Sequence, residues 1–144
     1  MPNRPIRDII RNQSVIIIPG AATVRTAAHI MKEHRIGALL VVDGDRLAGI
    51  FTERDALFRV LAGGLDPDRT PVERVMTRDP TTIAPDRPVL HALHLMHDGG
   101  FRHLPVVERG RPVGVVSIRD AMGLELARFE QEIDEKQAIA EILA

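Results

Sequence analysis

The chain has 144 residues, 44% of them hydrophobic and 27% charged, which is the composition of a soluble globular protein. Its 19 basic and 20 acidic side chains nearly cancel, so we do not expect binding to nucleic acid through bulk positive charge. The absence of cysteine excludes disulfides, thiol nucleophiles and thiolate metal sites, and an aromatic content of 3% argues against stacking on single-stranded nucleic acid.

The N-terminal residues show no targeting or membrane signal. Residues 6–10 are interrupted by charge, so they lack the continuous apolar core of a secretion signal. No segment approaches the roughly 18 consecutive apolar residues of a membrane helix. We therefore expect a cytoplasmic protein without membrane contact.

An internal repeat organises the chain. When residues 15–56 are aligned with residues 80–121, 13 of the 42 positions are identical, in order and without gaps. Upstream, residues 6–10 align with residues 72–76 after a slip of one residue. Such self-similarity indicates two copies of one structural unit.

Each copy predicts the element order β-α-β-β-α. In the first copy we expect a short strand at 15–18, a helix, strands at 38–42 and 47–52, and a second helix from Glu53. Gly37 is predicted to mark the end of the first helix. That helix carries apolar residues at i, i+3, i+4 and i+7, which are Val24, Ala27, Ala28 and Met31.

The second copy repeats this pattern. Its expected strands are 81–83, 104–107 and 113–117, and its last helix begins near Ile118. The Gly99–Gly100 pair is predicted to end the first helix. The apolar positions of that helix are Val89, Ala92, Leu93 and Met96.

The predicted fold class is α/β, in its α+β form, with two tandem repeats and a C-terminal helix. We place the repeats at residues 1–64 and 65–124 and the helical extension at 125–144. One unit of this size has a thin core, so we expect the two to pack sheet to sheet about a pseudo-twofold axis. Such packing would leave two equivalent clefts at the seam.

Arg119 to Leu143 is predicted to form one long helix. Residues 125–144 carry six acidic and two basic side chains, a net charge of -4. An apolar row with 4-3 spacing suggests a strut between the subunits of a dimer. A solvated terminal helix and a contact for a target protein are the alternatives. The row comprises Met122, Leu126, Phe129, Ile133, Ala140 and Leu143, with Lys136 as a polar interruption.

One motif occurs in both copies, as residues 49–55 and 114–120. A glycine-led strand ends in a hydroxyl residue, and an aspartate follows three positions later where a helix begins. The hydroxyl and the free N–H groups of the helix start suit a phosphate, and the carboxylate suits the two hydroxyls of a ribose. The arginine between them adds positive charge. The same spacing also describes a helix capping box, which is compatible with ligand binding.

The doubled motif, the strand at 101–107 and the helix ending in methionine resemble a pair of CBS domains, named after cystathionine β-synthase. The resemblance covers about residues 5–124. It implies a non-catalytic regulatory module that senses an adenosine ligand (AMP, ADP, ATP, NAD(H) or S-adenosylmethionine) in clefts between the repeats. It also implies a homodimer and an unknown target protein, with no catalytic cofactor.

Carried onto this sequence, the resemblance implies a set of nucleotide-binding residues in each copy. Two differences between the copies favour the second copy as the binding site. The first copy has Leu39-Leu40-Val41 where the second has Leu104-Pro105-Val106, and it has Asn12 where the second has Met76-Thr77. The set comprises Ile16, Ile17, Ala38, Thr52, Arg54, Asp55, Thr81, Thr82, Arg102, His103, Leu104, Pro105, Ser117, Arg119 and Asp120.

Two other functions compete with nucleotide sensing. The first is a protein-interaction scaffold of the same fold, whose clefts are vestigial and whose surfaces bind other proteins. A small metalloenzyme could use His91, His94 and His97, but these positions do not share one helix face and no HExxH pattern accompanies them. We favour exposed polar positions for these histidines.

Overall fold

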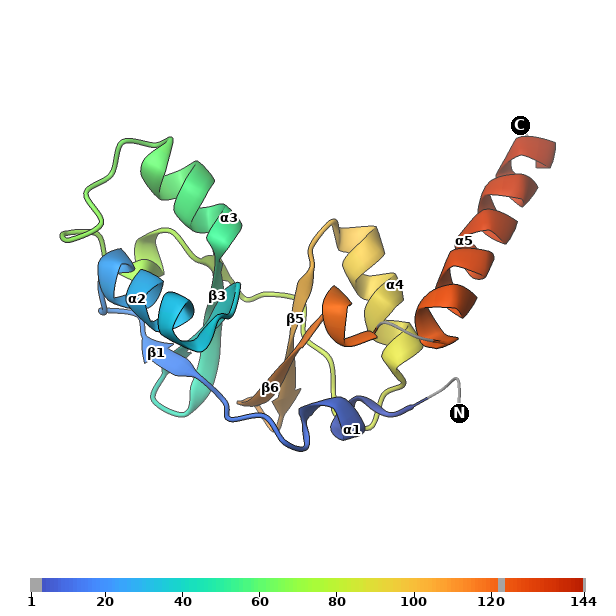
Figure 1. Ribbon diagram of the computed structural model, residues 1–144, viewed down its shortest axis with the longest axis horizontal. Coiled ribbons are helices and arrows are strands. Elements are labelled where there is room, and N and C mark those ends of the chain that lie inside the picture. The colour runs from blue at the N-terminus through green and yellow to red at the C-terminus, as the bar shows by residue number, and fades with distance from the viewer. Residues whose placement is uncertain (1–3, 122–123, 144) are drawn as a thin grey trace. The chain divides into compact units, whose positions relative to one another are not determined.

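The computed structural model describes residues 4–121 and 124–143. The chain forms two compact units, and each is built from separate stretches of sequence. The first-repeat unit comprises Ser14–Thr81 with Val107–Val113. The second-repeat unit comprises Met1–Gln13, Thr82–Val106 and Gly114–Ala144. The mixed α/β architecture with a C-terminal helix is as predicted (Figure 1).

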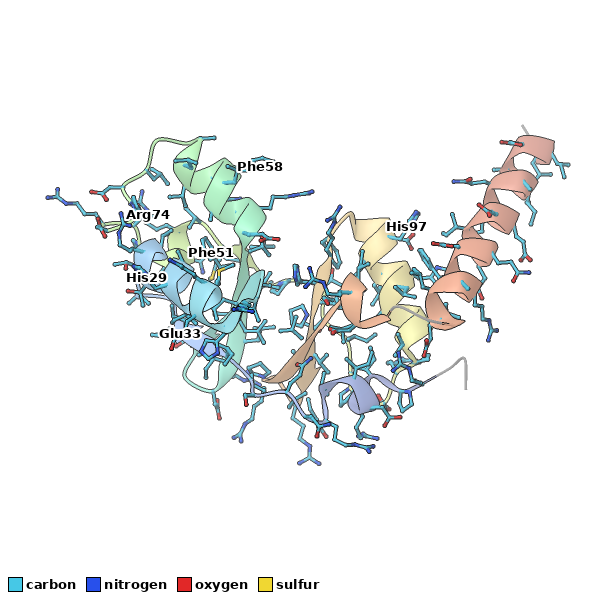
Figure 2. All side chains as sticks on the ribbon, viewed as in Figure 1. His29, Glu33, Phe51, Phe58, Arg74 and His97 are labelled. Atoms are coloured by element: carbon cyan, nitrogen blue, oxygen red, sulfur yellow. The ribbon has the colours of Figure 1, made fainter. Side chains whose placement is uncertain are left out.

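A four-stranded sheet in the order β1-β2-β3-β4 forms the first-repeat unit. Strands β1 and β2 are parallel, and the other neighbours are antiparallel. Five consecutive residues of β2 are buried, and Phe51 of β3 is fully buried among the core side chains (Figure 2). The strands are β1 (Ile17–Pro19), β2 (Ala38–Asp43), β3 (Arg46–Thr52) and β4 (Thr77–Arg78).

The helices of this unit begin and end for local reasons. Thr23 caps α2, because its side chain accepts a hydrogen bond from the N–H of Thr26. The helix ends at Arg35, whose φ of 55° lets its N–H reach the carbonyls of Lys32 and Met31. The prediction that Gly37 ends this helix was therefore wrong by two residues. The helices are α2 (Val24–His34), α3 (Glu53–Asp55), the π-helix η1 (Ala56–Leu61) and the 3₁₀-helix η2 (Val72–Arg74).

The second-repeat unit repeats this arrangement with a smaller sheet. The predicted strand at 81–83 is reduced to one parallel bridge, Ile83 to Val106, which matches the pairing of Ile18 with Val41 in the first repeat. Gly100 ends α4 with a φ of 72°, as predicted. Its helices are α1 (Ile6–Ile10), α4 (Val89–Gly99), the 3₁₀-helix η3 (Ile118–Ala121) and α5 (Leu124–Leu143). Its strands are β5 (His103–Glu108) and β6 (Arg111–Ser117), apart from residues Val107–Val113 at their turn, which belong to the first-repeat unit.

The first-repeat unit is completed by residues 70–78, which lead toward the second repeat. The N–H of Val24 donates to the carbonyl of Thr70 at 2.9 Å, and the N–H of Val72 donates to that of Ala22 at 2.8 Å. Further along, Thr77 pairs with Ile50 as part of β4. These bonds satisfy backbone groups at the start of α2 and at the edge of β3.

The second-repeat unit is completed in the same way by the residues that precede the first repeat. The N–H of Val89 donates to the carbonyl of Arg4 at 2.8 Å, and the N–H of Ile6 donates to that of Arg87 at 2.8 Å. The predicted alignment of residues 6–10 with 72–76 is thus confirmed. Each unit takes its closing segment from the stretch that leads into the other repeat.

The glycine that opens each motif lets the closing segment approach. A Cβ at Gly49 would lie 2.5 Å from Met76 Sδ and 2.7 Å from the backbone oxygen of Thr77. A Cβ at Gly114 would lie 2.6 Å from Cγ2 of Ile10. Contacts this short are not tolerated, so only glycine fits at these positions.

A side chain replaces the fourth strand in the second-repeat unit. Gln13 Nε2 donates to the carbonyl of Val115 at 2.9 Å, and the N–H of Val115 donates to Gln13 Oε1 at 3.1 Å. In the first-repeat unit the equivalent residue, Ile50, pairs with the backbone of β4. The carboxamide of Gln13 therefore satisfies the strand edge that β4 satisfies in the other copy.

The C-terminal region differs from the predicted single helix. Residues 118–121 form the 3₁₀-helix η3, and the α-helix begins only at Leu124. Met122, the first member of the predicted apolar row, lies outside the described residues. A 3₁₀ turn has tighter hydrogen bonding than an α-helix, so the two segments do not share one helical repeat.

The N-terminal half of α5 packs against its own unit. The Phe129 ring meets His94 and His97 edge-on, with centroid distances of 5.0 and 5.4 Å. Glu132 Oε2 lies 2.5 Å from His94 Nε2, and the buried Glu125 Oε1 lies 2.5 Å from Arg4 Nε. From Asp134 onward the helix is exposed, and Figure 1 shows it diverging from α4 toward its C-terminal end.

The two acidic contacts of α5 shift the pKa values of their carboxyl groups. Burial by itself would raise the pKa of Glu125, but the hydrogen bond and charge of Arg4, with a backbone bond, lower it overall. The hydrogen bond to His94 lowers the pKa of Glu132, against a smaller opposing effect of burial. Both carboxylates therefore help to hold α5 in place only while they are ionised.

We expect Gly49→Ala to destabilise the protein by about 1–3 kcal/mol, because the added methyl group meets the backbone of Thr77 as well as Met76. The measurement is thermal or urea unfolding. Gly20→Ala is the matched control, since the three nearest neighbours of its added methyl group are side-chain atoms of Glu73 and not backbone, and it should cost less. Equal losses for the two variants would contradict the role given to Gly49.

We expect α5 to loosen in acid. A lowered folded-state pKa means that the stabilisation is present above the ordinary glutamate value of about 4.3 and is lost as the pH falls through the folded value. Amide exchange of residues 128–133 at pH 6 and pH 3 should report this loss. Arg4→Gln should loosen α5 already at neutral pH, whereas Arg11→Gln, in the exposed pair with Asp8, should not. Protection that is the same at both pH values would refute the acid dependence.

Candidate functional site

The first motif lies where β3 runs into α3. Thr52, the last residue of β3, is the register partner of Ala38 at the start of β2. The N–H of Asp55 donates to Thr52 Oγ1 at 3.2 Å, and the N–H of Thr52 donates to Asp55 Oδ2 at 2.9 Å. This reciprocal pair is a complete capping box. The capping function considered for this spacing is therefore present.

Asp55 also takes part in a second contact. Its other oxygen, Oδ1, lies 3.5 Å from Nε of Arg59, one helical turn further on. Arg59 Nη1 in turn donates to the carbonyls of Val75 and Met76, at 3.1 and 3.0 Å. Asp55 is only 8% exposed, so its carboxylate is both buried and engaged at each oxygen.

The second motif has the same cap in a more open setting. The N–H and the hydroxyl of Ser117 lie 2.8 and 3.1 Å from Asp120 Oδ2, and the N–H of Asp120 donates to Ser117 Oγ at 3.3 Å. Asp120 is exposed. Within residues 4–121 and 124–143, no basic side chain is paired with it. Oδ1 of Asp120 can therefore accept a hydrogen bond from a ligand, whereas Oδ1 of Asp55 already faces Arg59.

A difference in sequence accompanies the difference in pairing between the two aspartates. Arg59 follows Asp55 by four residues, and the residue four after Asp120 is Leu124. A guanidinium can pair with the aspartate one turn back on a helix, whereas leucine cannot. This is a further reason to favour the second copy, in addition to the sequence differences.

The structure brings several of the other predicted residues of the first copy to one end of the sheet. Because β1 and β2 are parallel and β3 is antiparallel to β2, the start of β1, Ala38 and Thr52 lie at the same end. Ile16 is half-buried there, and Ile17 is exposed. Arg54 is exposed as well, and its guanidinium lies 5.9 Å from the ring centre of Phe58.

In the second-repeat unit the corresponding residues meet in the same manner. The N–H of Ile118 donates to the carbonyl of Arg102 at 3.1 Å, which joins the end of β6 to the start of β5, as Glu53 and Gly37 do in the first copy. Leu104 and Pro105 are buried, and the Pro105 carbonyl accepts the N–H of Ile83 at 3.0 Å. The side chains that remain accessible are those of Thr82, Arg102, His103, Ser117, Arg119 and Asp120.

Thr81 is grouped with the first-repeat unit and Thr82 with the second, and both are exposed. The chain therefore passes from one unit to the other between these two predicted residues.

Two residues that matter to the motifs were missed by the sequence analysis. Arg59 stands at i+4 from Asp55, a spacing that predicts a helical ion pair and could have been used. Gln13 gave no such signal, because a side-chain amide that replaces a strand becomes visible only in the folded unit.

Two histidines of α4, His94 and His97, contact α5. His91 and His94 are half-buried, against the expectation of exposed polar positions, and His94 contacts Glu132 of α5, while His97 is exposed beside Phe129. In the part of the chain that the structure describes, no three His, Asp or Glu side chains are grouped so that they could hold a metal ion. Among the same residues, no helix has the length and apolar character needed to cross a membrane.

Comparison with known proteins agrees with the doubled motif. The sequence model of the CBS domain family matches twice, over residues 6–62 and 72–126. A CBS domain-containing protein of Arabidopsis thaliana is 38% identical over 132 residues, which are 91% of this chain but only 24% of that protein's length.

Solved structures share the fold. A protein with CBS domains from Burkholderia ambifaria aligns with a TM-score of 0.77 and 33% identity, covering 82% of this chain and 90% of the other. A CBS domain protein from Pyrobaculum aerophilum, solved as a complex with AMP, aligns with a TM-score of 0.75 and 29% identity, covering 81% and 89%. With two family matches that span most of its length, the chain belongs to the CBS domain family and carries two tandem CBS repeats.

Proposed function

We propose that this chain is a non-catalytic regulatory module that binds an adenine nucleotide, with the Ser117–Asp120 motif as the primary site. The observation that carries the proposal is the exposed carboxylate of Asp120, three residues after a hydroxyl and at the start of a helical turn. A related protein of the same fold is known in complex with AMP. AMP is therefore the first ligand to test, followed by ADP, ATP, NAD(H) and S-adenosylmethionine.

The chemistry of the motif suits the three parts of a nucleotide. The exposed Arg119 offers a positive charge to phosphate, and the Ser117 hydroxyl offers a donor if it turns from Asp120 Oδ2 toward the ligand. Asp120 Oδ1 can accept hydrogen bonds from ribose hydroxyls while Oδ2 stays in the cap. The backbone near His103, Leu104 and Pro105 is the proposed edge for adenine. In the first copy the equivalent roles fall to Thr52, Arg54 and Asp55, with Ile16, Ile17 and Ala38 beside them.

A scaffold with vestigial sites is the main alternative. It is favoured by the complete capping boxes, since these explain both motifs through helix stability alone. A histidine-based metalloenzyme has less support, because His94 is already engaged by Glu132 and Phe129.

The proposal predicts that at least one adenine nucleotide stabilises the protein against heat. A ligand that binds only the folded state adds about 2.7 kcal/mol at 100 times its dissociation constant, which raises the melting temperature by several degrees. Thermal shift and calorimetry with the ligands named above measure this. No shift with any of them at millimolar concentration would leave the scaffold as the better explanation.

Variants of the two aspartates separate binding from capping. Asp120→Ala should weaken the tighter binding event at least tenfold and cost about 1 kcal/mol of stability through the lost cap. Asp55→Ala should cost more stability, because it leaves Arg59 without its partner, and should affect the tighter event little. Asp98→Ala, which alters an exposed carboxylate at the end of α4, is the control. Unchanged affinity in Asp120→Ala would mean that the cap is its whole function.

We also propose that the protein forms a homodimer. Two exposed apolar surfaces support this, one on η1 and one on the distal half of α5. Exposure of such an apolar stripe to water is unfavourable in free energy, so these surfaces favour contact with a partner. Figure 2 shows Phe58 on the helix that carries the first surface. The residues, all at least half exposed, are Leu57, Phe58 and Leu61 on η1, and Ile139, Ile142 and Leu143 on α5.

Truncation after Ile133 should weaken the dimer, because it removes the exposed stripe of α5. The contacts of Glu125, Phe129 and Glu132 with their own unit are kept, so folding and nucleotide binding should survive. Sedimentation at micromolar concentration measures the change. A full-length monomer would refute the dimer, and an unchanged truncated dimer would remove α5 from the interface.

A further inference from the structure

The geometry points to Arg59 as a positioning residue that couples ligand binding at Asp55 to the closing segment of the first-repeat unit, residues 70–78. This inference rests on the proposed binding of an adenine nucleotide. It adds a distinction between the two copies. A nucleotide bound to the first copy changes how firmly the closing segment is held, whereas a nucleotide bound to the second copy has no such effect. Arg59 belongs to neither the predicted site nor the repeated motif.

Arg59 connects two structures that are otherwise separate in the sequence. On one side its Nε lies 3.5 Å from Asp55 Oδ1. On the other side its Nη1 donates to the carbonyls of Val75 and Met76, at 3.1 and 3.0 Å. One guanidinium therefore holds the motif aspartate and the closing segment at the same time, and its planar shape fixes their relative position.

A ribose at Asp55 would compete with this arrangement. Oδ2 already accepts the N–H of Thr52, so we assign the ribose hydroxyls to Oδ1, the oxygen outside the capping box. Oδ1 is also the atom that faces Arg59. We infer that ribose hydroxyls at Oδ1 weaken its contact with the guanidinium, and that a shift of the guanidinium disturbs its bonds to Val75 and Met76.

The closing segment is placed to respond to such a shift. Met76 lies against Gly49 at the opposite end of the motif, and Thr77 pairs with Ile50. The N–H of Met76 donates to the carbonyl of Val72 at 2.9 Å, and that of Asp79 donates to Ala48 at 3.2 Å. These amides report directly on how firmly the segment is held. Beyond them the chain continues into the second repeat.

Among the residues that the structure describes, the second copy shows no counterpart to this connection. Leucine occupies position 124, which is equivalent to Arg59, and it offers no charge to Asp120 and no donor to a carbonyl. A ligand at Asp120 would therefore bind without displacing an ion pair. At the first site the ligand competes with Arg59 and its binding affects the closing segment. At the second site the ligand meets no such competitor.

The test compares the parent protein with Arg59→Met, which keeps most of the side-chain volume but removes the charge and the donors. Without ligand, the variant should exchange its Met76 and Asp79 amides faster than the parent, because the ties to Val75 and Met76 are gone. With AMP at saturation, exchange at these amides should rise in the parent and not rise further in the variant. The affinity of the first site for AMP should become about two- to fivefold tighter, as expected for loss of a partly exposed competing ion pair.

Two matched variants complete the design. Arg25→Met removes another surface arginine of the same unit, one paired with Asp68, and should behave as the parent. Asp55→Ala in the Asp120→Ala background should abolish the AMP effect on Met76 and Asp79.

The inference is overturned if AMP leaves these amides unchanged in a parent protein whose first site is occupied, or if Arg59→Met weakens AMP binding. The latter would mean that Arg59 holds the ligand. If the parent binds no AMP while other adenosine ligands do bind, the same measurements are made with the bound ligand. If none binds, the proposed function fails, and the coupling fails with it. A change in ligand-free exchange alone would then show only that Arg59 ties down the segment.

Discussion

Hydrogen bonding between each repeat and the segment that leads into the other repeat is the constraint on which this structure depends. Residues 70–73 bond to the loop before α2, and residues 4–7 bond in the same way before α4. A single repeat would leave a sheet edge and the first turn of a helix without partners. The first-repeat unit is closed by residues that follow it directly in the chain, whereas the second-repeat unit is closed by residues that precede the first repeat.

The repeated motif is the place where this closing segment meets the chemistry of the site. Its glycine admits the segment by close approach, and its aspartate caps the helix that follows. The strand between them is thus fixed at both ends. A ligand that engages the hydroxyl and the aspartate acts on residues that already hold the unit together.

The two copies have diverged at the residue that follows the motif aspartate by four positions. In the first copy this is Arg59, which engages the buried Asp55, and the helix continues as η1. In the second copy it is Leu124, the first residue of α5, a helix that packs through Phe129 and Glu132 onto α4. The same position therefore serves an ion-pair network in one repeat and the start of a new helix in the other.

The sequence by itself determined the repeat, the main strands and helices of each copy, the alignment of residues 6–10 with 72–76, and the two motifs, but not α1, β4 or the reduction of the strand at 81–83 to one bridge. These features rest on local spacing and on self-similarity, which the chain carries without being folded. Only the tertiary structure decided that Asp55 is buried against Arg59 while Asp120 is exposed, and that Gln13 replaces a strand. It also assigned Phe129 to contacts within its own unit. Burial and long-range pairing depend on which segments meet, and residues about 100 positions apart, such as Gln13 and Val115, give no local signal of their contact.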